Sequence, residues 1–121
     1  MTTTQDFFIN ILQLVDNNLK CSLQTSDNSL INVIKQMKNV KIYDSDSVDI
    51  LLNLENKQSL INHIIAYNSE EFIYHFEILR NNEIIFISHD GFEIATISSN
   101  VQLSEDFITK FVDTGTCIIV D

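Results

Sequence analysis

The acidic side chains of Asp44, Asp46 and Glu55 have the spacing of the first, third and twelfth residues of a calcium-binding loop. Such a loop also needs an oxygen ligand at its fifth position and a glycine at its sixth, where the chain turns sharply. The sequence has Val48 and Asp49 at these positions. The match therefore fails, and we interpret the segment as a solvated acidic turn that caps a following helix.

The three histidines, His63, His75 and His89, are scattered, and none has a cysteine or another histidine at the spacing of metal ligands. In a regular meander of strands, His75 and His89 would lie on opposite faces of the sheet. We therefore expect ordinary surface histidines, with no metal and no cofactor.

The remaining groups that could do chemistry are two cysteines and a pair of glutamates. Neither Cys21 nor Cys117 has a neighbouring histidine to activate it, and two glycines are too few for a phosphate-binding loop of the usual spacing. Glu77 and Glu93 could share one sheet face as an acid and a base, yet few polar residues are available to build a pocket around them. We expect no catalytic residues and predict that the protein is not an enzyme.

The cysteines also bear on the compartment, because a small secreted domain usually carries several disulfide bridges. Cys21 and Cys117 lie far apart in the sequence, which favours reduced, buried thiols and a cytoplasmic protein. A bridge between them would form if the first and last strands were neighbours.

The net charge of −10 is unevenly distributed along the chain. Residues 1–43 contain three acids and four bases, a net charge of +1, whereas residues 44–121 contain fourteen acids and three bases, a net charge of −11. Such a surface repels nucleic-acid phosphates and attracts a basic protein, although solubility alone also explains a high net charge. We expect a basic protein partner and no direct contact with nucleic acid.

A length of 121 residues and a hydrophobic content of 45% suit one compact domain, residues 1–121, with a single core. No apolar stretch approaches the roughly 18 residues of a membrane span, and the first residues lack the basic segment of a signal peptide. The sequence therefore predicts a soluble cytoplasmic protein without a membrane contact. The oligomeric state stays open.

Helical spacing of apolar residues predicts helices from Thr4 to about residue 19, at 29–38 and at 59–66, with another between 48 and the third helix. The expected N-caps are Thr4, Asp27 or Asn28, Ser45 or Ser47, and Ser104, which opens a short helix through residue 111. Strands are expected at 19–24 and 38–43.

Alternating apolar residues after position 71 predict a meander of three antiparallel strands, joined by tight turns at Asn81-Asn82 and Asp90-Gly91. Two-residue turns would place Arg80 opposite Glu83, Ile78 opposite Ile85, and Ile87 opposite both Phe76 and Ile94. The core face would then consist of Phe72, Tyr74, Phe76, Ile78, Ile85, Ile87, Phe92 and Ile94.

The predicted fold class is α+β: an antiparallel meander over about residues 71–98 and a C-terminal strand at 116–120, packed with N-terminal and central helices. The continuous apolar run of the last strand favours a central or covered position. The second face of the meander would carry His75, Glu77, Leu79, Ile84, Phe86, Ser88, Glu93, Ala95 and Ile97. If a second layer covers that face, its apolar groups are core; otherwise they form an apolar patch bordered by carboxylates, typical of a protein-binding surface.

In size, acidity and the meander from Phe72 to Ser98, the chain resembles the immunity proteins that neutralise bacterial toxins of contact-dependent growth inhibition and other polymorphic toxin systems. The resemblance implies an inhibitor that binds a cognate toxin domain, often a basic nuclease. The candidate contact residues are Glu77, Glu83, Phe86, Asp90 and Glu93, with Asp44, Asp46 and Asp49 as a second group.

Two other classes of small acidic protein compete with this interpretation. A nucleic-acid mimic, such as an anti-restriction or anti-CRISPR inhibitor, would carry rows of regularly spaced acids, whereas the acids here are irregular and interleaved with apolar residues. A secretion chaperone usually ends in a long helix and dimerises, whereas this chain is expected to end in a strand.

Overall fold

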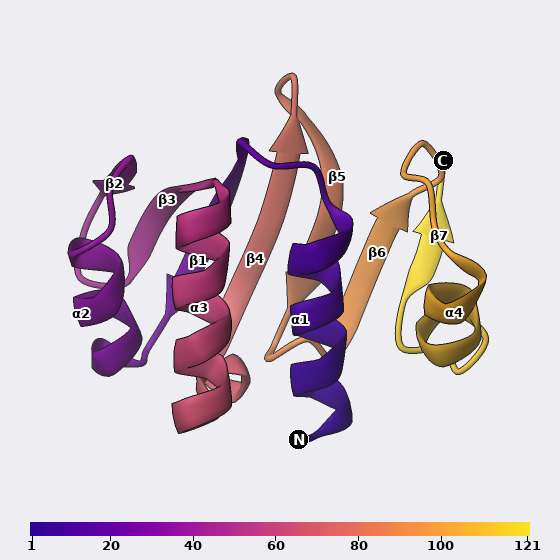
Figure 1. Cartoon of the computed structure of the whole chain (residues 1–121), viewed down its shortest axis with the longest axis horizontal. Coiled ribbons are helices and arrows are strands. Elements are labelled where there is room, and N and C mark those ends of the chain that lie inside the picture. Colours follow the sequence, from indigo (N-terminus) through magenta and orange to yellow (C-terminus); the bar gives the residue numbers. More distant parts are fainter.

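A computed structural model describes all residues, 1–121, as four helices and one seven-stranded sheet (Figure 1). The predicted α+β class is therefore confirmed. The elements follow in the order α1 (Thr3–Leu14), β1 (Leu19–Thr25), α2 (Asn28–Lys35), β2 (Val40–Ile42), β3 (Ser47–Leu52), α3 (Leu54–Tyr67), a 3₁₀ turn (Ser69–Phe72), β4 (Ile73–Arg80), β5 (Glu83–His89), β6 (Ile94–Ser98), α4 (Glu105–Phe107), a π-helical turn (Ile108–Val112) and β7 (Ile118–Val120).

The strands are arranged in the order β2-β3-β1-β4-β5-β6-β7. All neighbouring strands are antiparallel except β6 and β7, which are parallel. Helices α1, α2 and α3 lie side by side over one face of the sheet, and no element lies over the other face (Figure 1). No helix is both long and apolar enough to cross a bilayer.

The core lies between this helical layer and the sheet, and phenylalanines fill its centre. Phe7 of α1 packs against Phe86, Phe92 and Phe111, with ring centroids 5.2–6.3 Å apart. Each fully buried phenylalanine contributes roughly 1.5–3 kcal/mol to folding. This aromatic cluster therefore fixes α1 over the meander.

Side chains at the helix ends satisfy backbone groups much as the sequence predicts. Asp27 caps α2 and Ser104 caps α4, both as expected, while α1 begins at Thr3 with Thr2 rather than Thr4 as its N-cap. Asn53 caps α3. At the other end of α1, the ammonium group of Lys57 donates a 2.6 Å hydrogen bond to the carbonyl oxygen of Val15, which ties α3 to α1.

The meander exists, but its register differs from the prediction. Asn81 and Asn82 have the positive φ values of the expected turn, and Arg80 pairs with Glu83 as predicted. A bulge then inserts Ile85, so that Ile78 lies opposite Phe86. Because a shift of one residue exchanges the two faces, the sequence assigned much of the meander to the wrong side.

The second turn is also longer than expected. Residues 90–93 connect β5 to β6, and Ile94 pairs with His89 rather than Ile87, which lies opposite Thr96. Phe92 leaves the strand and enters the core. Of the predicted core face, Phe72, Tyr74 and Ile94 are exposed and Ile87 is only partly buried. On the predicted second face, Phe86, Ser88, Ala95 and Ile97 are core residues.

Two further expectations are wrong. The segment before α3, predicted as a helix capped by Ser45 or Ser47, is strand β3. Its buried residues alternate regularly along the strand, and Leu51 on its outer face produced the apparent helical spacing. The last strand is not central, because β7 forms an edge of the sheet and all three of its residues are exposed. Three strands separate Cys21 on β1 from the segment that carries Cys117, and both thiols are free.

Candidate functional site: the open face of the sheet

The sheet face opposite the helices is uncovered, and its character changes from one edge to the other. Near β2 and β3 the outward side chains are mainly polar or charged, whereas on β5 and β7 they are mainly apolar, and β6 carries Ile94 beside the polar Thr96 and Ser98. One row of cross-strand neighbours shows this gradient: Lys41, Asp49, Ser22, Glu77, Ile87, Thr96 and Ile118.

Asp49 is the centre of the polar half. Its carboxylate accepts hydrogen bonds from the hydroxyl groups of Ser22, at 2.6 Å, and Tyr43, at 2.5 Å, and lies 3.8 Å from the ammonium group of Lys20. The hydrogen bond to Asp49 raises the pKa of the Tyr43 phenol. Asp49 is thus the hub of a polar network and offers little free charge to a partner.

Asp44 and Asp46 lie in the exposed turn between β2 and β3. Asp44 accepts hydrogen bonds from the backbone amides of Asp46, at 3.0 Å, and Ser47, at 2.9 Å. Hydrogen bonding to Asp46 lowers the pKa of Asp44, and the same interaction raises the pKa of Asp46. These two carboxylates stabilise the turn and lie at the opposite side of the sheet from β7.

The other half of the face carries an uncovered apolar patch. The outward side chains of Ile84, Ile94 and Ile118 are 49%, 56% and 57% exposed, which is unusual for isoleucine on three neighbouring strands. The prediction from the sequence placed Ile87 and Ile94 in the core, because it included neither the bulge nor the longer turn. We define the apolar patch as Leu79, Ile84, Ile87, Ile94, Ile118 and Val120.

Acidic side chains lie beside this patch on two sides. Glu77 lies directly opposite Ile87 on the open face. Glu83, at the hairpin end of β5, pairs with Arg80 and follows the opposite alternation to Ile84, so it belongs to the other face of the sheet. Asp90 and Glu93 are exposed in the connection at the other end of the strands. Glu77, Asp90 and Glu93, which we call the acidic border, therefore lie beside the apolar patch, whereas the predicted contact residue Glu83 does not.

Phe86, the fifth residue of that predicted group, is not on the surface. Its ring is fully buried and packs against Phe7 and Phe76, with centroids 5.9 and 6.1 Å away. The bulge at Ile85 turns Phe86 inward. The prediction that Phe86 contacts a partner is therefore wrong, and Ile84 and Ile87 occupy the outward positions beside it.

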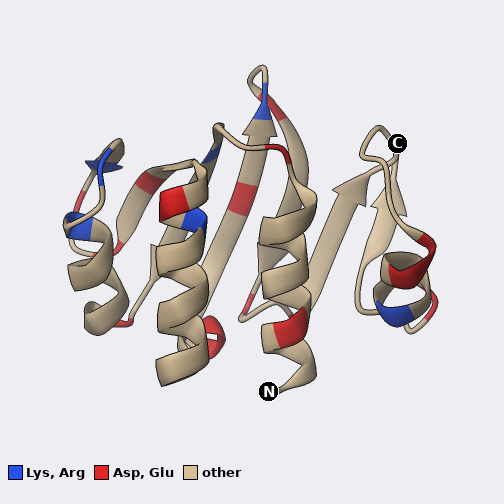
Figure 2. Cartoon of the chain, in the orientation of Figure 1, with Lys and Arg blue, Asp and Glu red and all other residues tan.

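Three of the seven lysine and arginine residues lie at the opposite edge of the molecule (Figure 2). These are Lys35, Lys38 and Lys41, on or beside α2 and β2, whereas β5, β6 and β7 carry no lysine or arginine. Residues 83–121 contain seven acids and one base, Lys110, a net charge of −6. The negative charge is thus concentrated on the part of the chain that carries most of the apolar patch.

The observed register of β4 and β5 also brings two histidines together. His75 on β4 and His89 on β5 are directly paired, and their Nδ1 atoms are 3.3 Å apart. Glu77 Oε2 lies 3.6 Å from His75 Nε2. The expectation that these histidines lie on opposite faces is therefore wrong, for the same reason as the error over Phe86.

A serine and an aspartate at the start of α2 also meet a histidine of α3. The Ser29 hydroxyl lies 3.2 Å from His63 Nε2 and donates a 2.7 Å hydrogen bond to Asp27. Burial lowers the pKa of His63, against the opposing effect of Asp27. In an activated serine the carboxylate orients the histidine, whereas here it binds the serine. This contact caps α2 and joins it to α3.

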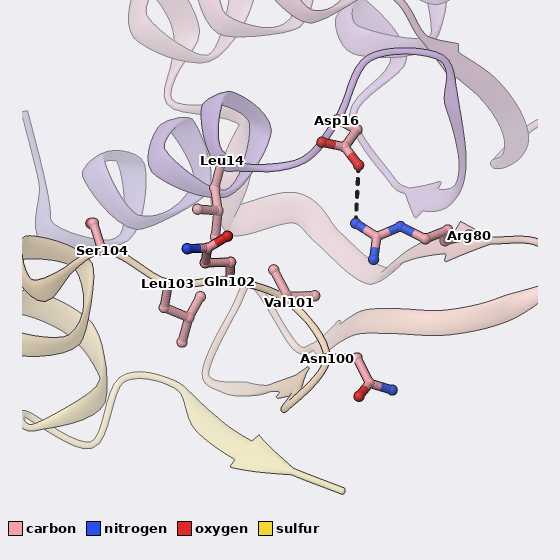
Figure 3. A pocket seen from close by; sticks show the side chains of 8 residues that line it. All are labelled: Leu14, Asp16, Arg80, Asn100, Val101, Gln102, Leu103 and Ser104. Carbon is pink, nitrogen blue, oxygen red and sulfur yellow. Dashed lines mark hydrogen bonds and ion pairs between the residues drawn. The ribbon is translucent and has the colours of Figure 1, made fainter.

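A surface hollow of about 560 Å³ opens beside the end of α1 and the loop that follows β6 (Figure 3). Asp16 and Arg80 point toward each other on its wall and form an ion pair of 3.2 Å. These are its only charged lining residues. The hollow therefore offers a ligand no unpaired charge.

No group of three or more histidine, cysteine, aspartate or glutamate residues converges on a point where a metal ion could sit. Comparisons with known proteins give no further guidance, since no family model, curated protein or solved structure matches the chain.

Proposed function

We propose that this chain is an inhibitor of the immunity-protein type, which binds a basic toxin domain through the apolar patch and its acidic border. The uncovered patch carries the proposal. Six apolar side chains from four neighbouring strands share a sheet face on which no helix packs, and carboxylates lie on two sides of them. This combination of an apolar centre and a charged margin is typical of protein interfaces.

The two parts of the surface would contribute differently to binding. The apolar side chains lose their contact with water when a partner covers them, which stabilises the complex by about 25 cal/mol per Å² before the costs of association. The acidic border and the net charge of −6 on residues 83–121 would attract a basic partner and increase its association rate. The patch would thus provide affinity, and the border selectivity and speed.

The same surface is less suited to mimicry of nucleic acid. A mimic replaces phosphates by rows of carboxylates, but the outward rows of this sheet contain only isolated acids, and Asp49 is matched by Lys20 and by Lys41 opposite it. The isoleucines interrupt any such row. An inhibitor that binds a protein surface therefore accounts for more of this face.

The test begins with isolation of the partner from the organism that encodes the chain. A tagged chain should retain one basic protein in stoichiometric amount at physiological salt. The purified partner is then titrated with Ile94→Asp and Glu93→Lys variants, and with Leu54→Asp and Glu55→Lys as matched controls on the helical side, where Leu54 is 72% exposed. Circular dichroism establishes that each variant is folded.

We expect Ile94→Asp to weaken binding at least about tenfold, chiefly through faster dissociation. Glu93→Lys should slow association and reduce its dependence on salt. The two control variants should bind like the unaltered chain. Retention of nucleic acid alone, or equal affinities for folded Ile94→Asp and Leu54→Asp, would contradict the proposal. An inhibitor must also abolish the toxicity of the isolated partner when the two are expressed together.

A further inference from the structure

The histidine pair on the open face has the geometry of two metal ligands. His75 and His89 extend from neighbouring strands at directly paired positions, with ring centroids 5.0 Å apart. Their Nδ1 atoms are 3.3 Å apart. Zinc–nitrogen bonds of about 2.0–2.1 Å in a tetrahedral arrangement separate two ligand nitrogens by roughly 3.3–3.4 Å. The two nitrogens therefore already have the separation that a shared metal ion requires.

We propose that His75 and His89 form a binding site for a divalent transition-metal ion of the Zn²⁺, Ni²⁺ or Cu²⁺ class. Without metal, the contact between the two Nδ1 atoms requires one proton, because at least one nitrogen must donate to the other. The metal takes the place of this proton, which moves through solvent to Nε2 of the same ring, and binds a lone pair from each neutral ring. No backbone rearrangement is needed, since the strand pairing already opposes the two residues.

Glu77 gives the site the second feature of natural metal centres. A metal-bound histidine usually directs its other ring nitrogen toward a carboxylate, which fixes the ring and increases its basicity. Glu77 is two residues from His75 on the same face of β4, and its Oε2 lies 3.6 Å from His75 Nε2. Glu77 would position His75, rather than bind the metal itself, once the two atoms close the few tenths of an ångström that separate this contact from a hydrogen bond.

The surroundings limit which ions the site can take. Two imidazoles select Zn²⁺, Ni²⁺ and Cu²⁺, whereas Mg²⁺ and Ca²⁺ prefer several oxygen ligands. No third histidine, cysteine or carboxylate joins the pair, so water would occupy the remaining coordination positions. Both histidines are only partly buried on a face without a covering layer, which leaves room for these waters. We therefore expect moderate affinity and readily exchanged metal.

This inference is independent of the proposed inhibitor function, because it can be tested on the isolated chain without a partner. The full-length chain, freed of any polyhistidine tag, is titrated with ZnCl₂ and with NiCl₂ by isothermal calorimetry, and with MgCl₂ as the negative control. We expect one ion per chain for Zn²⁺ and Ni²⁺ and no heat for Mg²⁺.

Variants then assign the site. His75→Gln and His89→Gln should each abolish this one-to-one binding, whereas Glu77→Gln should keep the stoichiometry and weaken the affinity by about tenfold. His63→Gln is the matched control, because His63 is remote from the open face and should not change the affinity. NMR spectra of the histidine rings give a readout that needs no variant: Zn²⁺ should shift the signals of His75 and His89 and leave those of His63 unchanged.

Each possible result has a distinct meaning for the proposed metal site. Absence of heat and of ring shifts with both Zn²⁺ and Ni²⁺ would overturn the proposal, and so would undiminished one-to-one binding to a folded His75→Gln or His89→Gln variant. Unchanged affinity in Glu77→Gln would remove the positioning role of Glu77. Loss of binding in His75→Gln and His89→Gln, with the folded His63→Gln control intact, would establish the site.

Discussion

The buried carboxylate of Glu70 offers a sharp test of the fold. Glu70 lies in the 3₁₀ turn between α3 and β4, is completely buried, and neither of its carboxylate oxygens accepts a hydrogen bond. Burial raises the pKa of Glu70 above its usual value near 4.5, because the charged form loses its water and the nearby donor groups of Gln5 and Thr2 only partly oppose this effect. A buried polar group without a partner costs roughly 1–3 kcal/mol.

The sign of the pH dependence follows from the raised pKa. Below the usual value of about 4.5, Glu70 is neutral in both the folded and the unfolded chain, and its ionisation costs nothing. As the pH rises toward the higher pKa of the folded state, the unfolded chain ionises more easily, and the folded state loses stability. Above both pKa values the cost is complete and constant.

Glu70→Gln removes the charge and nearly conserves the shape. We expect it to increase the free energy of unfolding by about 1–3 kcal/mol near pH 7.5, and to leave it nearly unchanged near pH 3.5. Urea unfolding followed by far-UV circular dichroism at both pH values measures the difference. Glu71→Gln is the matched control, since Glu71 is exposed and its substitution should have little effect. A loss of stability near pH 7.5, or an equal gain at both pH values, would refute the reasoning.

Two further predictions concern the meander and the thiols. Gly91 has a φ of +66°, and an added Cβ atom would lie 3.0 Å from the Glu71 carbonyl oxygen, so Gly91→Ala should lower the free energy of unfolding by about 1–3 kcal/mol. Gly115→Ala, with φ +83° and no atom within 4 Å, should cost only about 1 kcal/mol; equal costs in urea titrations would contradict the close approach at Gly91. Burial raises the pKa of Cys117 to about 11 and also raises that of Cys21, so we expect both thiols to react with a disulfide reagent only after unfolding. Fewer than two reactive thiols in the unfolded, unreduced chain would indicate a bridge.

Local signals predicted the elements of this fold well. Periodicity placed α1, α2, the second half of α3 and the three meander strands, and the caps Asp27 and Ser104 followed from residue type alone. These features depend on interactions within a few residues, which one sequence records directly. The concentration of acids after residue 43 was equally visible in the sequence.

The errors arose where a distant contact decides the local structure. β7 is a continuous apolar run that indicates a covered strand, yet its position depends on which strand it pairs with, and it lies at the edge beside β6. The segment that forms β3 carries one apolar residue, Leu51, on its outer face, and this gives the segment a helical spacing although it pairs with β1 as a strand. Neither outcome follows from local propensity.

The candidate site was predicted only in part, for the same reason. The acids of the acidic border lie in the turn before β6 or on an outward position of β4, so the errors in register did not change their exposure. The apolar part did not, because one inserted residue exchanges inward and outward side chains along the rest of a strand. Phe86 was therefore named in place of Ile87, and the pairing of His75 with His89 was overlooked.

The packing of Phe86 explains why the chain accepts the bulge at Ile85. A regular register would turn Phe86 outward and remove it from the cluster around Phe7, at a cost of roughly 1.5–3 kcal/mol, whereas a bulge sacrifices about one hydrogen bond, worth roughly 1 kcal/mol.

The core thus determines the inward residues but places no demand on the outward ones. On β1 the chain fills outward positions with Lys20, Ser22 and Gln24, so this sheet does not need apolar side chains there. On β5 the corresponding positions include Ile84 and Ile87, and on β6 they include Ile94 together with the polar Thr96 and Ser98. A purely structural account, in which isoleucine only favours the strand conformation, would predict the same choice on both halves of the face. The contrast within one sheet supports a contact on the β5–β7 half, next to the acids that would orient it.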